Sequence, residues 1–576
     1  MNTCPRWDLS PIYPDCDSPE FLQDLSWMVE EAKILENDLA SGLRGLKELL
    51  ERYELILDYL ENLSAYSSAC YTTDTANETY LRAVSQTEEA SLVVQRLEVA
   101  FLNYLAANKA QLSTEDLATY RYVFSQMLLQ QQHQMDPLLE DLASDLQRSG
   151  ADAFSRLQDA LGSSIQHCFD ASQPKTLVQL RSDAAHADRQ VRKQSFEREL
   201  ALLKLYETPF ASALNSVKGA TISLDARRAY ESPLARSLEQ SRIDGQILDA
   251  LISALQESLP MFRTYLKHKA KLLNLECCAF YDLFAPMNEQ EMHFTFEEAQ
   301  TFIISQFSSF SEEMGAFAAK AFSEHWIDAE SRSGKVGGAY DTAFPLARQS
   351  RILTNFDGTY SAVSTLAHEL GHAYHDSLVL DKSHLLRSYP MTLAETASIF
   401  SEFLVFQGAL KQGDERVRIN LIEHFLQEST QVCVDILSRY YFESDLFTRR
   451  KEGELSANEL CRMMEQAQRK TYGEALSEYH PYMWAVKGHY YSCDLAFYNY
   501  PYAFGQLFGL GLYSYSKKDS VNFPGEYKRL LAHTGCLGAD EVAQMVNIDL
   551  RDPQFYKDAL GVIASYVEEF VHGSHY

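Results

Sequence analysis

The chain is short of the residues that interrupt helices, with 25 glycines and 16 prolines in 576 residues. So few turn-forming residues predict long, uninterrupted elements. Apolar residues recur at helical spacing in segments 46–63, 92–105, 115–133, 188–206 and 244–273, the last with an expected interruption at Pro260. We therefore expect a mostly α-helical fold that opens with a bundle of long antiparallel helices. One hydrophobic core rarely fills a chain of this length, so we also expect two or more lobes.

Basic residues are also few. The 51 Lys and Arg stand against 80 Asp and Glu, a formal net charge of −29. Such a chain repels phosphate backbones and anionic membrane surfaces, so we expect neither nucleic acid nor a membrane as a partner. No run of about 18 apolar residues could span a bilayer, and the first residues form no apolar signal segment. The ten cysteines contain no C-x-x-C pair, which favours reduced thiols and a cytoplasmic location.

The segment 274–360 differs from the rest of the chain. Glycines gather at 334, 337, 338 and 358, and β-prone runs cover 336–341 and 351–356. This pattern predicts a small β-sheet inserted in a helical protein. The helical pattern returns at Tyr360, so the sheet would lie next to the helix that follows.

That helix carries the most specific motif of the chain, His368-Glu369-Leu-Gly371-His372. Residues four apart share one face of a helix, so His368 and His372 can offer two imidazole nitrogens to one ion. Glu369 lies beside that face and can reach a water molecule on the ion without binding the ion itself. Gly371 costs a helix about 1 kcal/mol relative to Ala. Close approach of another backbone would explain its presence.

A catalytic zinc site needs a third protein ligand. His375 is one candidate, but a single helix rarely directs three ligands to one tetrahedral ion. Glu395, 23 residues after His372, could come from a second helix. Alternatively, Thr392 and Glu395 form a capping box and Glu395 binds backbone N–H groups. Glu402 shares the face of Glu395 and would either orient a histidine from behind or remain a solvated helix charge.

The segments His368-Glu-Leu-Gly-His372-Ala-Tyr-His and Glu395-Thr-Ala-Ser-Ile-Phe-Ser-Glu402 resemble oligoendopeptidase F, of the thimet-oligopeptidase-like zinc metallopeptidases. Further matching pieces are Trp7-Asp-Leu-Ser, Tyr281-Asp-Leu-Phe-Ala-Pro, Gly337-Gly-Ala and Thr354-Asn-Phe-Asp-Gly. The resemblance extends over nearly the whole chain and is most specific at 350–405.

The resemblance implies a mostly α, two-lobed metallopeptidase with a deep central channel and a small β-sheet next to the zinc-binding helix. Together with the helical periodicity of the first 190 residues, this predicts an N-terminal helical-bundle domain at 1–190 and a catalytic zinc metallopeptidase domain at 191–576. His368, His372 and Glu395 would bind one Zn²⁺, and Glu369 would be the general base. The expected substrates are short peptides, cut at internal bonds.

Two further motifs follow from the resemblance. Gly337, Gly338 and Ala339 match a strand beside which the peptide would lie, although a plain turn is the alternative reading of these residues. His489, followed by Tyr498, Tyr500 and Tyr502, matches the donors that would bind the substrate and the oxyanion. Gly488 stands where relatives have Pro, and Pro501 is inserted in the aromatic run, so Tyr498 and Tyr500 both remain candidates.

Two other functions fit part of this pattern. A helical zinc carboxypeptidase shares the same ligand pattern but needs a cationic clamp for the terminal carboxylate, and Lys487 is the only basic residue in the segment 479–505 besides the histidines. A non-catalytic peptide-binding scaffold would be expected to have lost an essential residue. All four essential residues are present, namely His368, Glu369, His372 and Glu395. We therefore expect a zinc-dependent endopeptidase.

Overall fold

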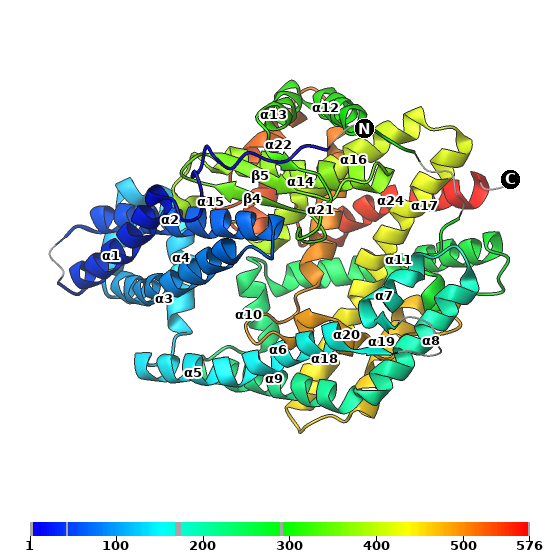
Figure 1. Cartoon of the computed structure of the whole chain (residues 1–576), viewed down its shortest axis with the longest axis horizontal. Coiled ribbons are helices and arrows are strands. Elements are labelled where there is room, and N and C mark those ends of the chain that lie inside the picture. The colour runs from blue at the N-terminus through cyan, green and yellow to red at the C-terminus, as the bar shows by residue number, and fades with distance from the viewer. Residues whose placement is uncertain (1–3, 42–43, 168–173, 288–291, 574–576) are drawn as a thin grey trace. The chain divides into compact units, whose positions relative to one another are not determined.

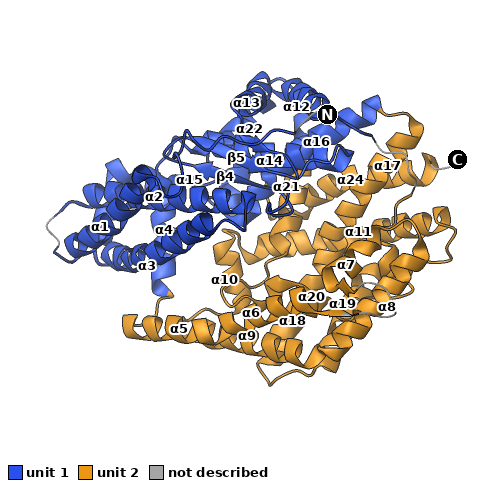
Figure 2. Ribbon diagram, in the orientation of Figure 1, with its two compact units in different colours: residues 1–132, 291–412, 512–548 blue, residues 133–290, 413–511, 549–576 orange. Residues whose placement is uncertain are grey.

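The computed structural model describes residues 4–41, 44–167, 174–287 and 292–573 of the chain (Figure 1). It is mostly helical, as expected, and separates into two compact units (Figure 2). Unit 1 contains residues 1–132, 291–412 and 512–548, and unit 2 contains residues 133–290, 413–511 and 549–576. The expected boundary at residue 190 separates two sequence domains, whereas the two units are defined by packing, and the two divisions need not coincide. The boundary at residue 190 stays a prediction.

Unit 1 begins with the expected long helices, whose apolar stripes face one another. On α2 the side chains of Leu49, Leu50, Tyr53 and Ile56 are buried, and Leu57 and Leu60 pack partly buried against the same core. The helices of unit 1 are α1 (Pro19–Ser41), α2 (Leu46–Thr73), α3 (Glu78–Ala107), α4 (Arg121–Gln132), α12 (Phe296–Phe310), α13 (Glu312–Ser323), α14 (Tyr360–Val379), α15 (His384–Arg387), α16 (Met391–Gln412), α22 (Phe523–Leu531) and α23 (Ala539–Gln544).

The expected small sheet lies in unit 1 and packs on α14. Its strands are β3 (Ile327–Asp328), β4 (Tyr340–Phe344) and β5 (Gln349–Leu353), in the order β3-β5-β4. β5 is parallel to β3 and antiparallel to β4, with Asp341 opposite Ile352. Among the described residues β4 therefore stands at the edge of the sheet, next to the helix that bears the histidine motif.

Unit 2 is built on a second core, to which Leu203, Phe210, Leu446, Met464 and Trp484 contribute. Its helices are α5 (Pro137–Ser149), α6 (Ala151–Ser164), α7 (Leu177–Ser182), α8 (Arg189–Leu205), α9 (Glu207–Arg227), α10 (Pro233–Gln240), α11 (Gly245–Leu272), α17 (Glu415–Thr430), α18 (Ile436–Arg450), α19 (Ala457–Tyr472), α20 (Met483–Val486) and α24 (Pro553–Gly573). It also holds the two-residue strands β1 (Gln166–His167) and β2 (Lys175–Thr176), while α21 (Tyr500–Ser516) belongs partly to each unit.

Two local expectations are corrected by the structure. Helix α11 continues through Pro260, because Leu255, Leu259 and Phe262 bury the same apolar side of the helix before and after it. The strand expected at 336–341 begins only at Tyr340. None of the described helices is both long and apolar enough to cross a membrane, and the nine described cysteines are free thiols.

Candidate active site

Helix α14 presents the two motif histidines on one face. The helix starts after Thr359, whose side-chain hydroxyl accepts a hydrogen bond from the N–H of Ala362. From that start His368 and His372 fall one turn apart, and their ring centroids lie 4.9 Å from each other. Both rings are partly exposed. The side chains are therefore positioned to bind one ligand together.

Helix α16 brings Glu395 to the same point. Its Oε2 lies 3.3 Å from Nε2 of His368 and 3.6 Å from Nε2 of His372. Ligand atoms around a tetrahedral zinc ion with bonds of about 2.0 Å are about 3.3 Å apart, so Oε2 of Glu395 lies at nearly that separation from each imidazole nitrogen. Ser398 donates a hydrogen bond to the same Oε2 at 2.9 Å. The carboxylate thus faces the imidazoles and does not cap its helix.

Gly371 is the contact that lets α14 and α16 come this close. A Cβ at this position would lie 2.6 Å from the carbonyl oxygen of Ala397 and 2.7 Å from Cα of Ser398. The backbone of α16 therefore occupies the space that a side chain would need. This confirms the interpretation of the glycine as a point of close backbone packing.

Glu402 orients His368 from behind. Its Oε2 lies 3.2 Å from Nδ1 of His368, while its Oε1 accepts a hydrogen bond from Ser364 at 3.1 Å. In the metal-free protein the ring thus faces Glu402 through Nδ1 and Glu395 through Nε2. Although burial opposes a charge on this ring, its hydrogen bonds to Glu395 and Glu402 raise the pKa of His368 well above its ordinary value. The arrangement matches the carboxylate partners that metal-binding histidines usually have.

The pKa values of the other two ionisable side chains of the cluster are both lowered, which leaves one side chain neutral and the other charged. Burial, together with the nearby His368, lowers the pKa of His372 to about 4, so this ring is neutral at pH 7. Burial acts to raise the pKa of Glu395, but its hydrogen bond with His368 and the charges of both histidines lower it to about 2. A neutral imidazole and an ionised carboxylate are the forms that bind a divalent metal.

Glu369 lies next to this cluster and is 7% exposed. Burial raises its pKa to about 7. A carboxylate with a pKa near the working pH suits a general base. The structure thus places a base beside the three candidate ligands.

His375 takes no part in the cluster. It is fully buried, its Nε2 lies 2.7 Å from the hydroxyl of Thr534, and its ring stacks on Tyr389. Of the two candidates for a third ligand, only Glu395 lies with His368 and His372, all three within 4.8 Å of one another.

A second group with ligand-like spacing is Asp58, Glu61 and His384. Here a cation of the protein is already present, because Nη2 of Arg387 lies 2.6 Å from both carboxylates. This group is therefore a salt-bridge network that joins α2 to α15.

Gly337, Gly338 and Ala339 form a bend that leads into β4 and not a strand of their own. Gly338 has φ +83°, a conformation that disfavours other residues, and its carbonyl accepts a hydrogen bond from the Asn355 side chain. Both glycines are exposed, and a Cβ atom placed on either of them would have no atom within 4 Å. The backbone is thus open for close approach, but the strand that could pair with a peptide starts one residue later.

The sequence-predicted oxyanion donors all lie in unit 2. The rings of His489 and Tyr498 stack with centroids 5.8 Å apart, and the hydroxyls of Tyr498 and Tyr502 are 2.9 Å apart. Tyr500 is 1% exposed, and its hydroxyl donates to the carbonyl of Ser237 at 3.1 Å. The structure groups His489 with Tyr498 and Tyr502, and places Tyr500 in the core.

His489 is held in its neutral form. Burial, then the charges of Arg439 and Lys487, lower its pKa to about 2. Its Nε2 has no hydrogen-bond partner among the described residues. A neutral imidazole can donate one N–H to a substrate oxygen, which is the chemistry expected of an oxyanion donor.

Sequence reasoning missed two residues that hold the site together, Ser364 and Ser398. Ser364 stands four residues before His368, and Ser398 three residues after Glu395, so helical spacing could have revealed both.

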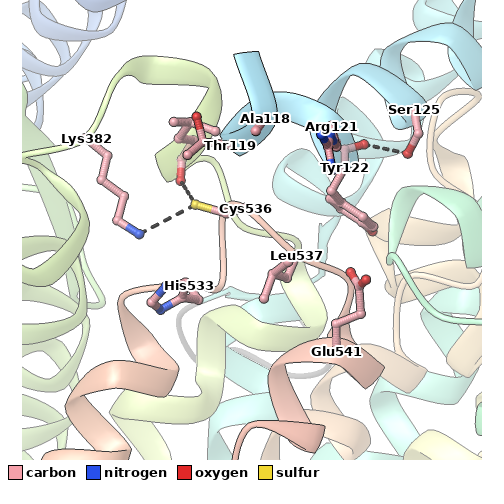
Figure 3. A pocket seen from close by; sticks show the side chains of 11 residues that line it. Ala118, Thr119, Arg121, Tyr122, Ser125, Lys382, His533, Cys536, Leu537 and Glu541 are labelled. Atoms are coloured by element: carbon pink, nitrogen blue, oxygen red, sulfur yellow. Dashed lines mark hydrogen bonds between the residues drawn. The ribbon is translucent and has the colours of Figure 1, made fainter. Parts of the chain in front are cut away.

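A separate cavity of about 720 Å³ lies elsewhere in unit 1 (Figure 3). At its wall Nζ of Lys382 lies 3.5 Å from Sγ of Cys536, which itself donates to the carbonyl of Leu386 at 3.1 Å. The residues that line it are Ala118, Thr119, Arg121, Tyr122, Ser125, Lys382, Leu386, His533, Cys536, Leu537 and Glu541. It includes no residue of the histidine cluster.

A mostly helical fold, with paired histidines on one helix and a carboxylate from the next, defines a helical metallopeptidase. Comparison with known families agrees: the model of peptidase family M3 matches residues 184–562, and that of oligopeptidase F matches residues 106–166. The chain belongs to peptidase family M3.

Individual relatives support this assignment. The group B oligopeptidase PepB of Streptococcus agalactiae is 24% identical over 90% of this chain and 88% of its own. The oligopeptidase PepF of Bacillus subtilis is 23% identical over 98% of this chain and 86% of its own. Among solved structures, one from Chlamydophila abortus has a TM-score of 0.80 at 21% identity, covering 97% of this chain and 98% of that one. Oligoendopeptidase-F from Enterococcus faecium has a TM-score of 0.66 at 18% identity, covering 96% and 97%.

Proposed function

We propose that the protein is a zinc-dependent oligoendopeptidase in which His368, His372 and Glu395 hold one Zn²⁺ and Glu369 is the general base. The observation that carries the proposal is the convergence of two Nε2 atoms and one carboxylate oxygen within 4.8 Å, beside a buried carboxylate. Two imidazoles and a carboxylate are a common donor set of catalytic zinc sites. Bound there, zinc would polarise a carbonyl and lower the pKa of a water molecule.

The chain's own residues would do the rest. Glu369 removes a proton from the attacking water and later delivers it to the leaving amine. We assign oxyanion stabilisation to His489 and Tyr498, because one is a neutral imidazole and the other is a phenol beside it. Tyr502 is proposed to bind the substrate with them. Tyr500 no longer belongs in this set, since its hydroxyl binds Ser237.

The expected substrates are short peptides, as the names of the relatives suggest. An extended peptide would add as a strand along the edge of β4, where the open backbone of Gly337 and Gly338 leads in. A channel that excludes folded proteins, a catalytic domain at 191–576 and a cytoplasmic location are parts of the same proposal.

The test uses a fluorogenic peptide blocked at both ends, which an endopeptidase cuts and a carboxypeptidase does not. The purified protein should contain about one equivalent of zinc, and a chelator should stop cleavage until zinc is added back. Glu369→Gln should abolish turnover and retain zinc, whereas Glu415→Gln, an exposed change in the first turn of α17, should alter neither. Full activity of Glu369→Gln, or a protein purified without chelators that binds no zinc, would refute the proposal.

A further inference from the structure

One motif that the chain shares with its relatives still has no role, the segment Thr354-Asn-Phe-Asp-Gly. It begins directly after β5 and ends just before α14. Its side chains make hydrogen bonds in two directions, toward the bend at Gly337 and Gly338 and toward the first turn of α14. The segment is therefore a short connector between the open bend and the helix that carries the histidine pair.

Asn355 clamps the bend with its side-chain amide, which has two protons to donate. Its Nδ2 donates to the carbonyl oxygen of Val336 at 3.0 Å and to that of Gly338 at 3.0 Å. These carbonyls belong to the peptide groups before Gly337 and after Gly338, so one side chain spans both glycines. Because glycine has the freest backbone of all residues, this clamp decides which conformation the bend adopts.

The clamp also sets the direction of two N–H groups. In a trans peptide group the carbonyl and the N–H point in opposite directions, and the described residues contain no cis peptide bond. The carbonyls of Val336 and Gly338 are turned toward Asn355. The N–H groups of Gly337 and Ala339 therefore point away from it, and within the described part of the chain neither has a hydrogen-bond partner. Donors two residues apart on one side are the pattern of a strand edge.

Packing inside the protein does not require glycine at position 337. Gly337 has no positive φ, and a Cβ atom added to it would meet no atom within 4 Å. A glycine that the fold does not need, beside two free donors, keeps open the space through which another backbone could approach. An extended peptide fits this place, because its carbonyl oxygens are acceptors for donors at this spacing.

The far end of the connector fixes the start of α14. Oδ1 of Asp357 accepts a hydrogen bond from the N–H of Thr359 at 3.0 Å and from its hydroxyl at 2.7 Å. The same hydroxyl oxygen accepts from the N–H of Ala362 in the first turn of the helix at 3.2 Å. His368 follows about two turns after the start of the helix. The bend and the histidine helix are thus held by the two ends of one short segment.

The loop that enters the bend is anchored without Asn355. Nζ of Lys335, whose side chain is fully buried, donates to the carbonyl of Thr354 at 2.6 Å. The N–H of Val336 donates to the carbonyl of Thr72 at 2.9 Å. Loss of the Asn355 amide therefore frees the glycines without unfolding the loop that leads to them.

We propose that Asn355 is a positioning residue for peptide binding: its amide clamps the bend at Gly337 and Gly338 so that two backbone N–H groups face outward for the carbonyl oxygens of an extended substrate. The inference rests on the proposed endopeptidase function and deepens it. Recognition at this point uses the main chain of the substrate and selects no particular side chain. Because the connector also starts α14, it sets the position of the bound peptide relative to the histidine pair.

The test compares Asn355→Asp, which keeps the size of the side chain and removes both donors, with the wild type and with Asn108→Asp. Asn108 caps the C-terminal end of α3, and its amide likewise donates to a main-chain carbonyl, that of Tyr104, at 2.9 Å. Asn355→Asp should raise KM for a blocked peptide by about tenfold or more, with kcat within about threefold and zinc content unchanged. The reason is that hydrogen bonds common to the bound substrate and the transition state are lost.

Gly337→Ala tests the same surface without touching the clamp. It should also raise KM by about tenfold, because the methyl group occupies the space in front of the donors. The urea midpoint of unfolding should not fall, since no protein atom lies near the added methyl group.

Hydrogen exchange gives a readout that does not depend on turnover, measured by mass spectrometry on fragments that contain residues 336–340. In Glu369→Gln, a blocked peptide should slow the exchange of the Gly337 and Ala339 amides by about tenfold. With Asn355→Asp added, the same peptide concentration should slow it less than about twofold.

If Asn355→Asp changes KM no more than Asn108→Asp does, or if bound peptide leaves both amides unprotected, the inference is wrong. If the wild type cuts no peptide, or if Glu369→Gln remains active, the proposed function fails. The exchange of the two amides with and without peptide then still decides whether the bend binds a peptide chain.

Discussion

The close contact at Gly371 gives the sharpest prediction. Gly371→Ala would place a methyl group 2.6 Å from the carbonyl oxygen of Ala397, 0.8 Å short of the 3.4 Å at which ordinary contact begins. Two of the three nearest atoms are backbone atoms of α16 and the third is the hydroxyl oxygen of Ser401 on the same helix, so relief requires α14 and α16 to separate. Overpacking of this kind costs about 1–3 kcal/mol, partly offset by the gain of about 1 kcal/mol in helix propensity. We expect a net loss of up to about 2 kcal/mol in the free energy of unfolding.

The effect on metal binding should exceed the effect on stability. Ala397 and Ser398 lie two and three residues after Glu395, so a shift of α16 moves the carboxylate away from both histidines. Metal sites tolerate only about 0.2 Å of error in ligand position. Zinc affinity, measured by competition with a chromophoric chelator, should therefore fall by about tenfold or more.

Gly561→Ala is the control for this experiment. Gly561 lies in helix α24 with no atom within 4 Å of a virtual Cβ, so the same change should stabilise the protein by up to about 1 kcal/mol. Urea unfolding of the metal-free proteins measures both variants. If Gly371→Ala also stabilises the protein and leaves zinc affinity intact, the reasoning about the helix crossing is refuted.

Three further predictions follow from the site. Glu402→Ala should weaken zinc binding by about 10–100-fold, because His368 loses the partner of its Nδ1; an unchanged zinc titration would contradict this. Tyr498→Phe should lower kcat by a factor of about 10²–10³ without loss of stability. Tyr500→Phe should instead lower the free energy of unfolding by about 1 kcal/mol and leave kcat unchanged. The reverse pattern would identify Tyr500 as the oxyanion donor. Burial lowers the pKa of His375 in the folded protein to about 3. Below about pH 6.5 the unfolded chain therefore binds a proton on this histidine, and the folded chain does not. Metal-free protein should therefore lose stability as pH falls from 6.5, and His375→Phe should reduce that slope by about 1.4 kcal/mol per pH unit in denaturation curves; an unaltered slope would show that His375 is not the group responsible.

The sequence was most informative where function depends on spacing within one helix. The four-residue interval between His368 and His372 places both on one face wherever a helix forms, and the unfavourable Gly371 pointed to a neighbouring backbone. The mostly helical fold and the small sheet before α14 were also predictable, since they follow from residue periodicity and from clustered glycines.

Features that depend on contacts between distant segments were not predictable. The choice between Tyr498 and Tyr500 depends on Ser237, which lies more than 250 residues earlier in α10. The strand began at Tyr340 because the positive φ of Gly338 bends the chain just before it.

The way the chain divides between its two units has a consequence for how the protein can be handled. The backbone passes from one unit to the other after residues 132, 290, 412, 511 and 548, so each unit is assembled from three separate stretches. A fragment cut at residue 190 would contain α1–α4 without the later segments that complete unit 1, and would expose apolar surface to water. Neither unit can be expressed alone as one continuous segment of the chain. Because many contacts within each unit join residues that are far apart in the sequence, folding should be slow and should be completed only after the last helices are synthesised.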